Sequence, residues 1–322
     1  MLRRYQITLV LALLFVGSAF GQQFPGEDEN IPYLITFGQN GETSWGDDDF
    51  SQTFFLAIPL TEKDPIYIRV YDPDIGGAVD EVKGDFNTRC KFSVYGGKEA
   101  FSHPHAQGYN PEGKYDSGVL LASKTFGVNP KYDENWYTFG PFNPNEGEKV
   151  ESQKAYIFKV IAEGTTGDDG NLYKYFVSTR PNENLKVEGA NAFTYEYTFR
   201  MPNERSICHI YPFIDDNVVS IKQYNFDWDA DGLIRVVSIA RKGEPVSMSA
   251  DDVWAISKHK VSDREKNTSL DIQLIKSKAI NNNNVVVRVT NQYGEAMPFY
   301  SIPIGGKPTY QAIIKAEKIK QR

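Results

Sequence analysis

Four acidic side chains lie within ten positions of one another in a segment that begins like a strand. Residues 67–82 read YIRVYDPDIGGAVDEV and contain Asp72, Asp74, Asp80 and Glu81. Crowded carboxylates repel one another and each is more stable in its own water, so the grouping calls for a compensating charge. A hard cation such as calcium takes about six to eight oxygen ligands from nearby loop segments. The segment therefore predicts a calcium site; the alternative is an ordinary solvated loop.

The order of the residues favours convergence of the acidic side chains. Asp72 and Asp74 are two positions apart and project to the same side if the strand persists. Pro73 stiffens the path, and the glycines at 76 and 77 permit a tight reversal that returns Asp80 toward the first pair.

The spacing D-x-D-x5-D at 72, 74 and 80 resembles the third calcium loop of synaptotagmin-type, calcium-dependent phospholipid-binding domains. In that family the equivalent aspartates share calcium ions with a second loop, so the resemblance implies a shared site here. The resemblance covers this loop alone. The nearest acidic loop upstream, with Asp47, Asp48 and Asp49, is closer than the first aspartate loop of that family, so membrane binding is not carried over.

A further acidic pair, Asp168 and Asp169, lies between two strand-like runs in AEGTTGDDGNLY. Loops of a sandwich gather at its two ends. If the loops near 47, 74 and 168 share an end, Asp47, Asp49, Asp168 and Asp169 would join the site of Asp72. The alternative for Asp168 and Asp169 is a hairpin turn, because Asp-Gly tolerates positive φ.

Another candidate calcium loop is YNFDWDADGLIRV, with Asp227, Asp229 and Asp231 before a glycine. The pattern D-x-D-x-D-G resembles the front half of the calcium loops of helix-loop-helix, dockerin and integrin-propeller proteins, in which alternate carboxylates converge on the ion. The back half departs from those families, because Ser238 replaces the last acidic ligand. We expect a weak site here, or a solvated turn.

The rest of the chain predicts an all-β protein. Short apolar or alternating runs recur between Gly, Pro, Asn and Asp clusters, and the clearest strand is AFTYEYTFRM at 192–201. The polar segment MPNERS at 201–206 marks a boundary. We therefore predict two antiparallel β-sandwich domains of jelly-roll or immunoglobulin-like type: a larger one at 22–203, with the acidic loops, and a smaller immunoglobulin-like one at 204–305, followed by a basic tail at 306–322.

The N-terminus predicts export. Residues 1–21 combine two arginines, a short apolar run and small residues at the cut, which is the pattern of a signal peptide. No segment approaches the length of a membrane span. We expect a secreted protein that is extracellular, periplasmic or at the cell surface. The net charge of −7 argues against a nucleic-acid partner.

Two further residue pairs have alternative interpretations. Cys90 and Cys208 could form a disulfide in an oxidising compartment, or both could be buried thiols. Trp136 and Tyr137, in NWYTFGPFNP, could bind a ligand by stacking on a sugar, or could pack in the core.

These observations together predict a secreted, non-catalytic, calcium-binding β-sandwich protein. Its expected role is cell-surface adhesion, ligand binding or assembly, with a cell-surface protein or a glycan as partner. One alternative is a secreted carbohydrate-binding or polysaccharide-degrading protein, because the carboxylates of a glycosidase can lie anywhere in a sequence. The other is a structural protein without metal.

Overall fold

The structure is a computed structural model that describes residues 23–308. It is all-β and built from antiparallel sheets, which confirms the predicted fold class and is consistent with β-sandwich domains. The predicted signal peptide and most of the predicted basic tail lie outside the described residues. Among the described residues, no helix has the length and apolarity needed to span a membrane.

The largest sheet has nine strands and runs through both halves of the molecule. Its order is β18 (Trp254–Lys260), β15 (Ser220–Phe226), β21 (Asn284–Asn291), β12 (Glu196–Arg200), β2 (Tyr33–Phe37), β10 (Gly170–Ser178), β4 (Ile66–Tyr71) and β7 (Trp136–Phe142), with β1 (Gln23–Phe24) paired to β10.

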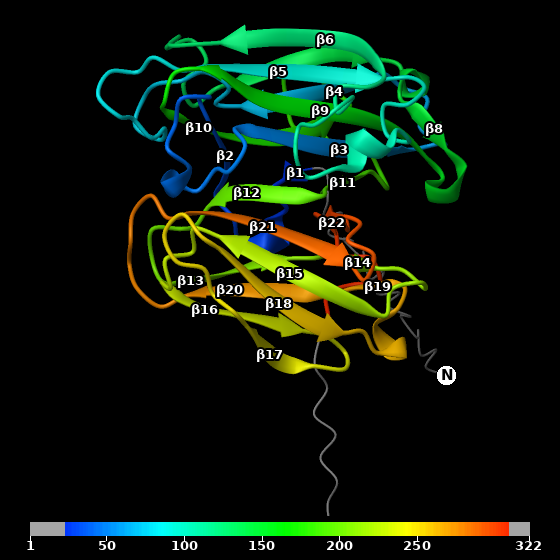
Figure 1. Ribbon diagram of the computed structural model, residues 1–322. Helices are drawn as coiled ribbons and strands as arrows, with labels where there is room; N and C mark the ends of the chain where they lie inside the picture. Colours follow the sequence, from blue (N-terminus) through cyan, green and yellow to red (C-terminus); the bar gives the residue numbers. More distant parts are fainter. Residues whose placement is uncertain (1–22, 309–322) are drawn as a thin grey trace, which may run out of the picture.

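Two smaller sheets cover the two halves of the large one (Figure 1). The upper sheet in that view has the order β22 (Phe299–Tyr300), β11 (Asn191–Thr194), β3 (Ser51–Pro59), β9 (Ala155–Thr166), β5 (Arg89–Gly96) and β6 (Val119–Phe126), with β8 (Glu148–Val150) on β9. The lower sheet has the order β13 (Ser206–Ile210), β20 (Asp271–Lys276), β16 (Gly232–Val237) and β17 (Lys242–Val246). A short pair, β14 (Phe213–Ile214) and β19 (Thr268–Ser269), completes the strands described.

The helical elements are single 3₁₀ turns in the connections. They are η1 (Glu27–Glu29), η2 (Thr43–Trp45), η3 (Pro104–Gln107), η4 (Pro144–Glu146), η5 (Glu151–Gln153) and η6 (Asp263–Glu265).

The run predicted as one strand at 192–201 is two strands in two sheets. β11 pairs with β3 and β22, whereas β12 pairs with β2 and β21. The Thr194 hydroxyl donates to the Glu196 carbonyl at 2.6 Å and so stabilises the crossing. Phe193 packs with Phe55 in one apolar cluster and Tyr197 packs in another, so burial on both sides replaces the simple alternation of an exposed strand.

The principal core is continuous across the predicted boundary near residue 203. It contains Phe54 and Phe158 of the upper sheet together with Ile234 and Leu274 of the lower sheet. Because β12 pairs on one side with β2 and on the other with β21, the two halves share one sheet. The division into units at 22–203 and 204–305 stays a prediction.

The described structure contains no disulfide between the two cysteines. Cys90 lies on β5 and Cys208 on β13, in different sheets, and both are free and buried. The Cys208 thiol donates to the Asn30 carbonyl at 3.1 Å. Burial raises the pKa of both thiols, so they are buried small side chains, as the alternative interpretation held.

Glu29, in η1, is a fully buried carboxyl group. Its Oε2 accepts bonds from the Gly26 amide and, at 2.9 Å, from the Tyr197 hydroxyl, whereas Oε1 has no partner among the described residues. Burial raises the pKa of Glu29 to about 8. The folded chain therefore holds a proton that the unfolded chain has already released at neutral pH.

We predict that Glu29→Gln flattens the pH dependence of stability. The pKa of Glu29 is 4.5 in the unfolded chain and about 8 in the folded chain. Between these two pH values the folded chain alone holds the proton, so the free energy of unfolding falls as the pH rises. In urea titrations, the variant should lose about 3 to 4 kcal/mol less than the wild type between about pH 5 and pH 8. Glu27→Gln, an exposed position in the same turn, is the matched control. Equal slopes for Glu29→Gln and wild type would contradict the assignment.

Candidate cation sites and a carboxylate pocket

The end of β4 brings two predicted residues against a loop that the sequence did not single out. Asp72 has a left-handed φ of 55°, and its amide donates to the Asn135 carbonyl at 3.0 Å. Asp72 Oδ1 accepts from the Glu134 amide at 2.9 Å, and Asp74 Oδ2 accepts from the Asn129 amide at 3.0 Å. The β4–β5 loop is thus bound to the β6–β7 loop through its carboxylates.

Each of these carboxylates leaves its other oxygen without a hydrogen bond. Asp72 Oδ2, Asp74 Oδ1 and Asp133 Oδ1 are buried atoms with no partner among the described residues. Asp72 and Asp74 are each only 1 % exposed. Gly77, at φ 69°, lies so close to Asp133 that a Cβ atom would overlap its carboxylate. Together with the exposed Glu134, these residues are called the Asp72 cluster below.

In the Asp72 cluster, no lysine or arginine of the described residues acts on the pKa of Asp72 or Asp74. Burial raises the pKa of Asp72 to about 7, and the neighbouring charges of Asp74, Asp133 and Glu134 act in the same direction. Burial and the charge of Asp133 likewise raise the pKa of Asp74. The hydrogen bonds from backbone amides oppose both shifts but are outweighed.

Asp80, the third residue of the predicted spacing, returns toward the pair but is satisfied by the backbone. Its Oδ1 accepts from the Leu172 amide at 2.7 Å and its Oδ2 from the Gly76 amide at 2.8 Å. Burial raises its pKa, and the charges of Asp72 and Asp74 add to this. Asp80 therefore supports the loop and adds negative potential.

Asp168 and Asp169 form the turn between β9 and β10 and bind the end of the β4–β5 loop. Asp169 Oδ2 accepts from the amides of Asn87 and Thr88, at 2.7 and 3.0 Å, and its Oδ1 accepts from the Lys83 amide at 3.2 Å. Asp168 Oδ1 accepts from the Asn87 side-chain amide at 2.8 Å. These contacts correspond to the hairpin-turn alternative, because both carboxylates accept hydrogen bonds from amide groups of the β4–β5 loop.

Asp47, Asp48 and Asp49, between η2 and β3, offer carboxylate oxygens within 4.8 Å of one another. Asp47 is fully buried and accepts from the amides of Phe37 and Phe50, at 2.8 and 3.0 Å. Asp49 Oδ1 accepts from the Ser51 amide at 2.9 Å. By contrast, Asp48 Oδ1 and Asp49 Oδ2 are buried and without a partner among the described residues.

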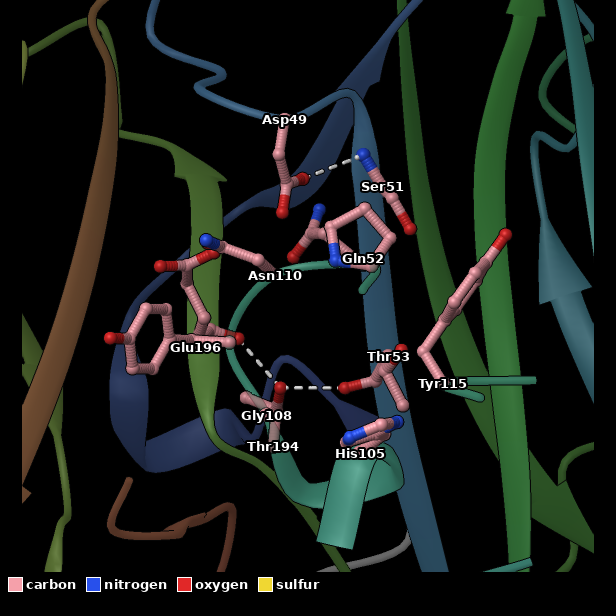
Figure 2. Close-up of a pocket in the computed structure, with 12 residues that line it drawn as sticks. Asp49, Ser51, Gln52, Thr53, His105, Gly108, Asn110, Tyr115, Thr194 and Glu196 are labelled. Carbon is pink, nitrogen blue, oxygen red and sulfur yellow. Dashed lines mark hydrogen bonds between the residues drawn. The ribbon is translucent and has the colours of Figure 1, made fainter. Parts of the chain in front are cut away.

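Asp49 lines a small cavity of about 20 Å³ that also contains Glu196 of β12. Figure 2 shows both side chains together with Asn110 and His105 of the β5–β6 connection, which also line the cavity. A cavity of this size holds about one water molecule or one bare ion. We call it the carboxylate pocket.

Arg288, a cation, contacts two residues that line the carboxylate pocket, Glu196 and Tyr109. Arg288 of β21 donates to Glu196 Oε2 at 3.4 Å, and its guanidinium lies 4.1 Å from the ring centroid of Trp254 and 4.2 Å from that of Tyr109. Burial raises the pKa of Glu196 well above its ordinary value, Asp48 and Asp49 add to the shift, and Arg288 opposes it. The pocket thus combines unsatisfied acceptors with a fixed arginine.

A third acidic group forms in the lower half from Asp227, Asp229 and Asp251, whose oxygens lie within 4.8 Å of one another. The Asp227 carboxylate accepts from the Asp252 amide at 2.9 Å. Burial raises the pKa of Asp227 to about 7. Asp231, the third residue of the predicted motif, is not in this group; its carboxylate faces Asn283 at 3.4 Å.

Trp136 and Tyr137, neighbours on β7, point to opposite faces of the sheet. Tyr137 packs against the core beside Phe126 and Phe139. Trp136 is half-buried on the outer face, with the Arg69 guanidinium 4.8 Å from its ring centroid and Tyr71 beside it. They cannot form one stacking surface, and Trp136 alone remains on the outside.

Sequence reasoning missed Asp133, Asp251, Glu196 and Arg288. Asp133 stands in KYDENW and Asp251 in SADDVW, both short acidic pairs between strands, which is the pattern that identified the other loops. A different sequence signal could have identified Glu196 and Arg288 as candidate site residues. Each is a charged residue inside an otherwise apolar and aromatic strand.

We predict that Arg288→Met lowers the free energy of unfolding by about 2 kcal/mol, because it leaves Glu196 and Asp48 buried without their cation. Urea denaturation measures the change. Adding Glu196→Gln should restore part of the loss, because the unpaired charge is then removed. Lys149→Met, which breaks the exposed pair with Glu151, is the control and should change stability little. An Arg288→Met protein as stable as the wild type would refute this account of the pocket.

No protein-family model matches this chain, and no curated protein matches it.

Proposed function

We propose that this chain is a secreted, non-catalytic, calcium-binding β-sandwich protein that acts in cell-surface adhesion, ligand binding or assembly. Calcium would bind at the Asp72 cluster, between the β4–β5 and β6–β7 loops. One observation carries the proposal: three buried carboxylate oxygens, on Asp72, Asp74 and Asp133, have no hydrogen-bond partner among the described residues.

A buried carboxylate without a partner is costly, so it takes up a proton or a cation. In the Asp72 cluster, the charges that act on the pKa of Asp72 and Asp74 all come from other carboxylates. On Asp72 and Asp74 one oxygen is fixed by a backbone amide, which orients the other as a ligand. Oxygen ligands from two loops are what calcium takes.

Calcium would also draw the two loops together. Within residues 23–308, only the groups Asp47–Asp48–Asp49 and Asp227–Asp229–Asp251 already offer three oxygens within 4.8 Å of one another. The Asp72 cluster is therefore more open than a filled site, and binding would move Asp133 toward Asp72 and Asp74. Such a cross-link between loops would stiffen the end of the upper sandwich, which suits a protein exposed outside the cell.

The resemblance to the synaptotagmin-type loop supports the proposal at the level of local chemistry. In this chain the second loop is the one with Asp133, so Asp47 and Asp49 are not needed for the shared site. The alternatives remain a secreted carbohydrate-binding or polysaccharide-degrading protein and a structural protein without metal.

We expect calcium to raise the melting temperature of the full chain by about 5 °C at roughly a hundred times its dissociation constant. Asp72→Asn combined with Asp74→Asn should abolish this response and the heat of calcium binding in calorimetry. The same variant should melt at or above the wild-type temperature in chelator, because the mutual repulsion is gone.

Two matched variants make this test specific. Asp85→Asn changes an exposed acid elsewhere in the β4–β5 loop and should leave the response intact. Asp227→Asn with Asp229→Asn removes the third acidic group and reports whether that group binds calcium as well. A wild-type melting temperature that is identical in chelator and in millimolar calcium, with no heat of binding, would exclude the proposal.

A further inference from the structure

A larger pocket lies beside the Asp72 cluster. Its volume is about 510 Å³, within the range of small-molecule sites. It shares the 127–132 segment with the cluster: the Asn129 amide donates to Asp74, and Tyr132 directly precedes Asp133. The lining residues belong to the end of the β4–β5 loop, to the ends of β5 and β6, and to the 127–132 segment. We call it the Lys124 pocket.

Two cations line the Lys124 pocket, and neither forms an ion pair with a described residue. The Lys124 ammonium lies 4.3 Å from the ring centroid of Tyr137 and 4.6 Å from that of Tyr132, and it donates to the Tyr132 hydroxyl at 3.1 Å. It is therefore fixed in position before any ligand arrives. Arg89 is exposed and passes beside Gly127, where a Cβ atom would lie 3.6 Å from its Cγ.

Uncharged groups complete the pocket wall. Phe86 is half-buried and makes no ring contact with another described aromatic residue, so its ring is available to a ligand. Thr125 and Asn129, both exposed, supply a hydroxyl and an amide that can donate and accept hydrogen bonds. Aromatic faces next to neutral hydrogen-bonding groups suit a sugar ring, and the two cations suit a carboxylate on it.

We propose that the Lys124 pocket binds an acidic saccharide, with a uronate carboxylate between Lys124 and Arg89 and a sugar ring against Phe86. A densely charged polyphosphate fits less well, because the Asp72 cluster lies behind the shared segment and the chain carries a net charge of −7. A uronate spaces its charges with neutral hydroxyl groups. The pocket shares the 127–132 segment with the proposed calcium site, but no carboxylate lines it and it needs no bound ion.

The proposal is tested by calorimetric titration of the full chain with trigalacturonate, in calcium and again in chelator. We expect saturable one-to-one binding in at least one buffer, with an affinity that falls as salt is added. Arg89→Gln and Lys124→Met should each weaken binding at least tenfold, and Phe86→Ala should also weaken it. Lys149→Met, remote on β8, should bind like the wild type.

Two further probes decide the class of ligand. A neutral trisaccharide and inorganic phosphate should each bind far more weakly than trigalacturonate. Absence of trigalacturonate binding in both buffers, equal affinity for either probe, or unchanged affinity in Arg89→Gln would overturn the proposal. Arg89 is exposed, so its variant remains a valid test even if Lys124→Met fails to fold.

Discussion

The loops of this protein are held by carboxylates that accept hydrogen bonds from the backbone of other loops. Asp47 binds the amide of Phe37, Asp80 that of Leu172, and Asp169 that of Thr88. Loops between antiparallel strands have many unpaired amides, and a short acidic side chain satisfies them where no strand can. The cost is that the charge is taken out of water, which raises the pKa of Asp47 to about 7. The positions of the acidic residues therefore depend on the balance between the backbone hydrogen bonds that their carboxylates gain and the hydration that they lose.

The buried carboxylates are of two kinds, according to how many of their oxygens accept hydrogen bonds from the backbone. Where both oxygens accept hydrogen bonds from backbone amides, as in Asp80 and Asp169, the carboxylate stabilises the loop structure. Where one oxygen is bound and the other is buried without a partner, as in Asp72, Asp74 and Asp49, the side chain is oriented but incomplete. Such a residue leaves a buried acceptor without a hydrogen bond, and this costs the fold stability. The same sequence feature, an aspartate between two strands, thus has two roles that only contacts can separate.

The all-β class could be predicted from the strand rhythm, and the pairing of Asp72 with Asp74 follows from their spacing. The partner loop could not be predicted, because Asp133 reaches Asp72 only through the non-local pairing of β4 with β7. In the same way, Asp251 replaces Asp231 beside Asp229 because the loop after β17, and not the end of the motif, packs on it. The break between β11 and β12 was also hidden, since burial on both sides imitates one long strand. Local sequence patterns identify acidic side chains, whereas the strand order of the sheets decides which of them come together.

Sheet order also explains why the carboxylate pocket and the Asp72 cluster differ in their distance from arginine and lysine side chains of the protein. The carboxylate pocket lies where β12 and β21 join the two halves, so a strand of the lower half can supply Arg288 to an acid of the upper sandwich. The Asp72 cluster lies at the far side of the shared sheet, beside the edge strand β7, and its neighbouring lysine, Lys124, is held by aromatic rings on the other side of the 127–132 segment. That segment separates an acidic loop from a basic pocket. If the two proposed sites are occupied together, a cation in the loop and an anion in the pocket would attract one another, and each would lower the free energy of binding the other.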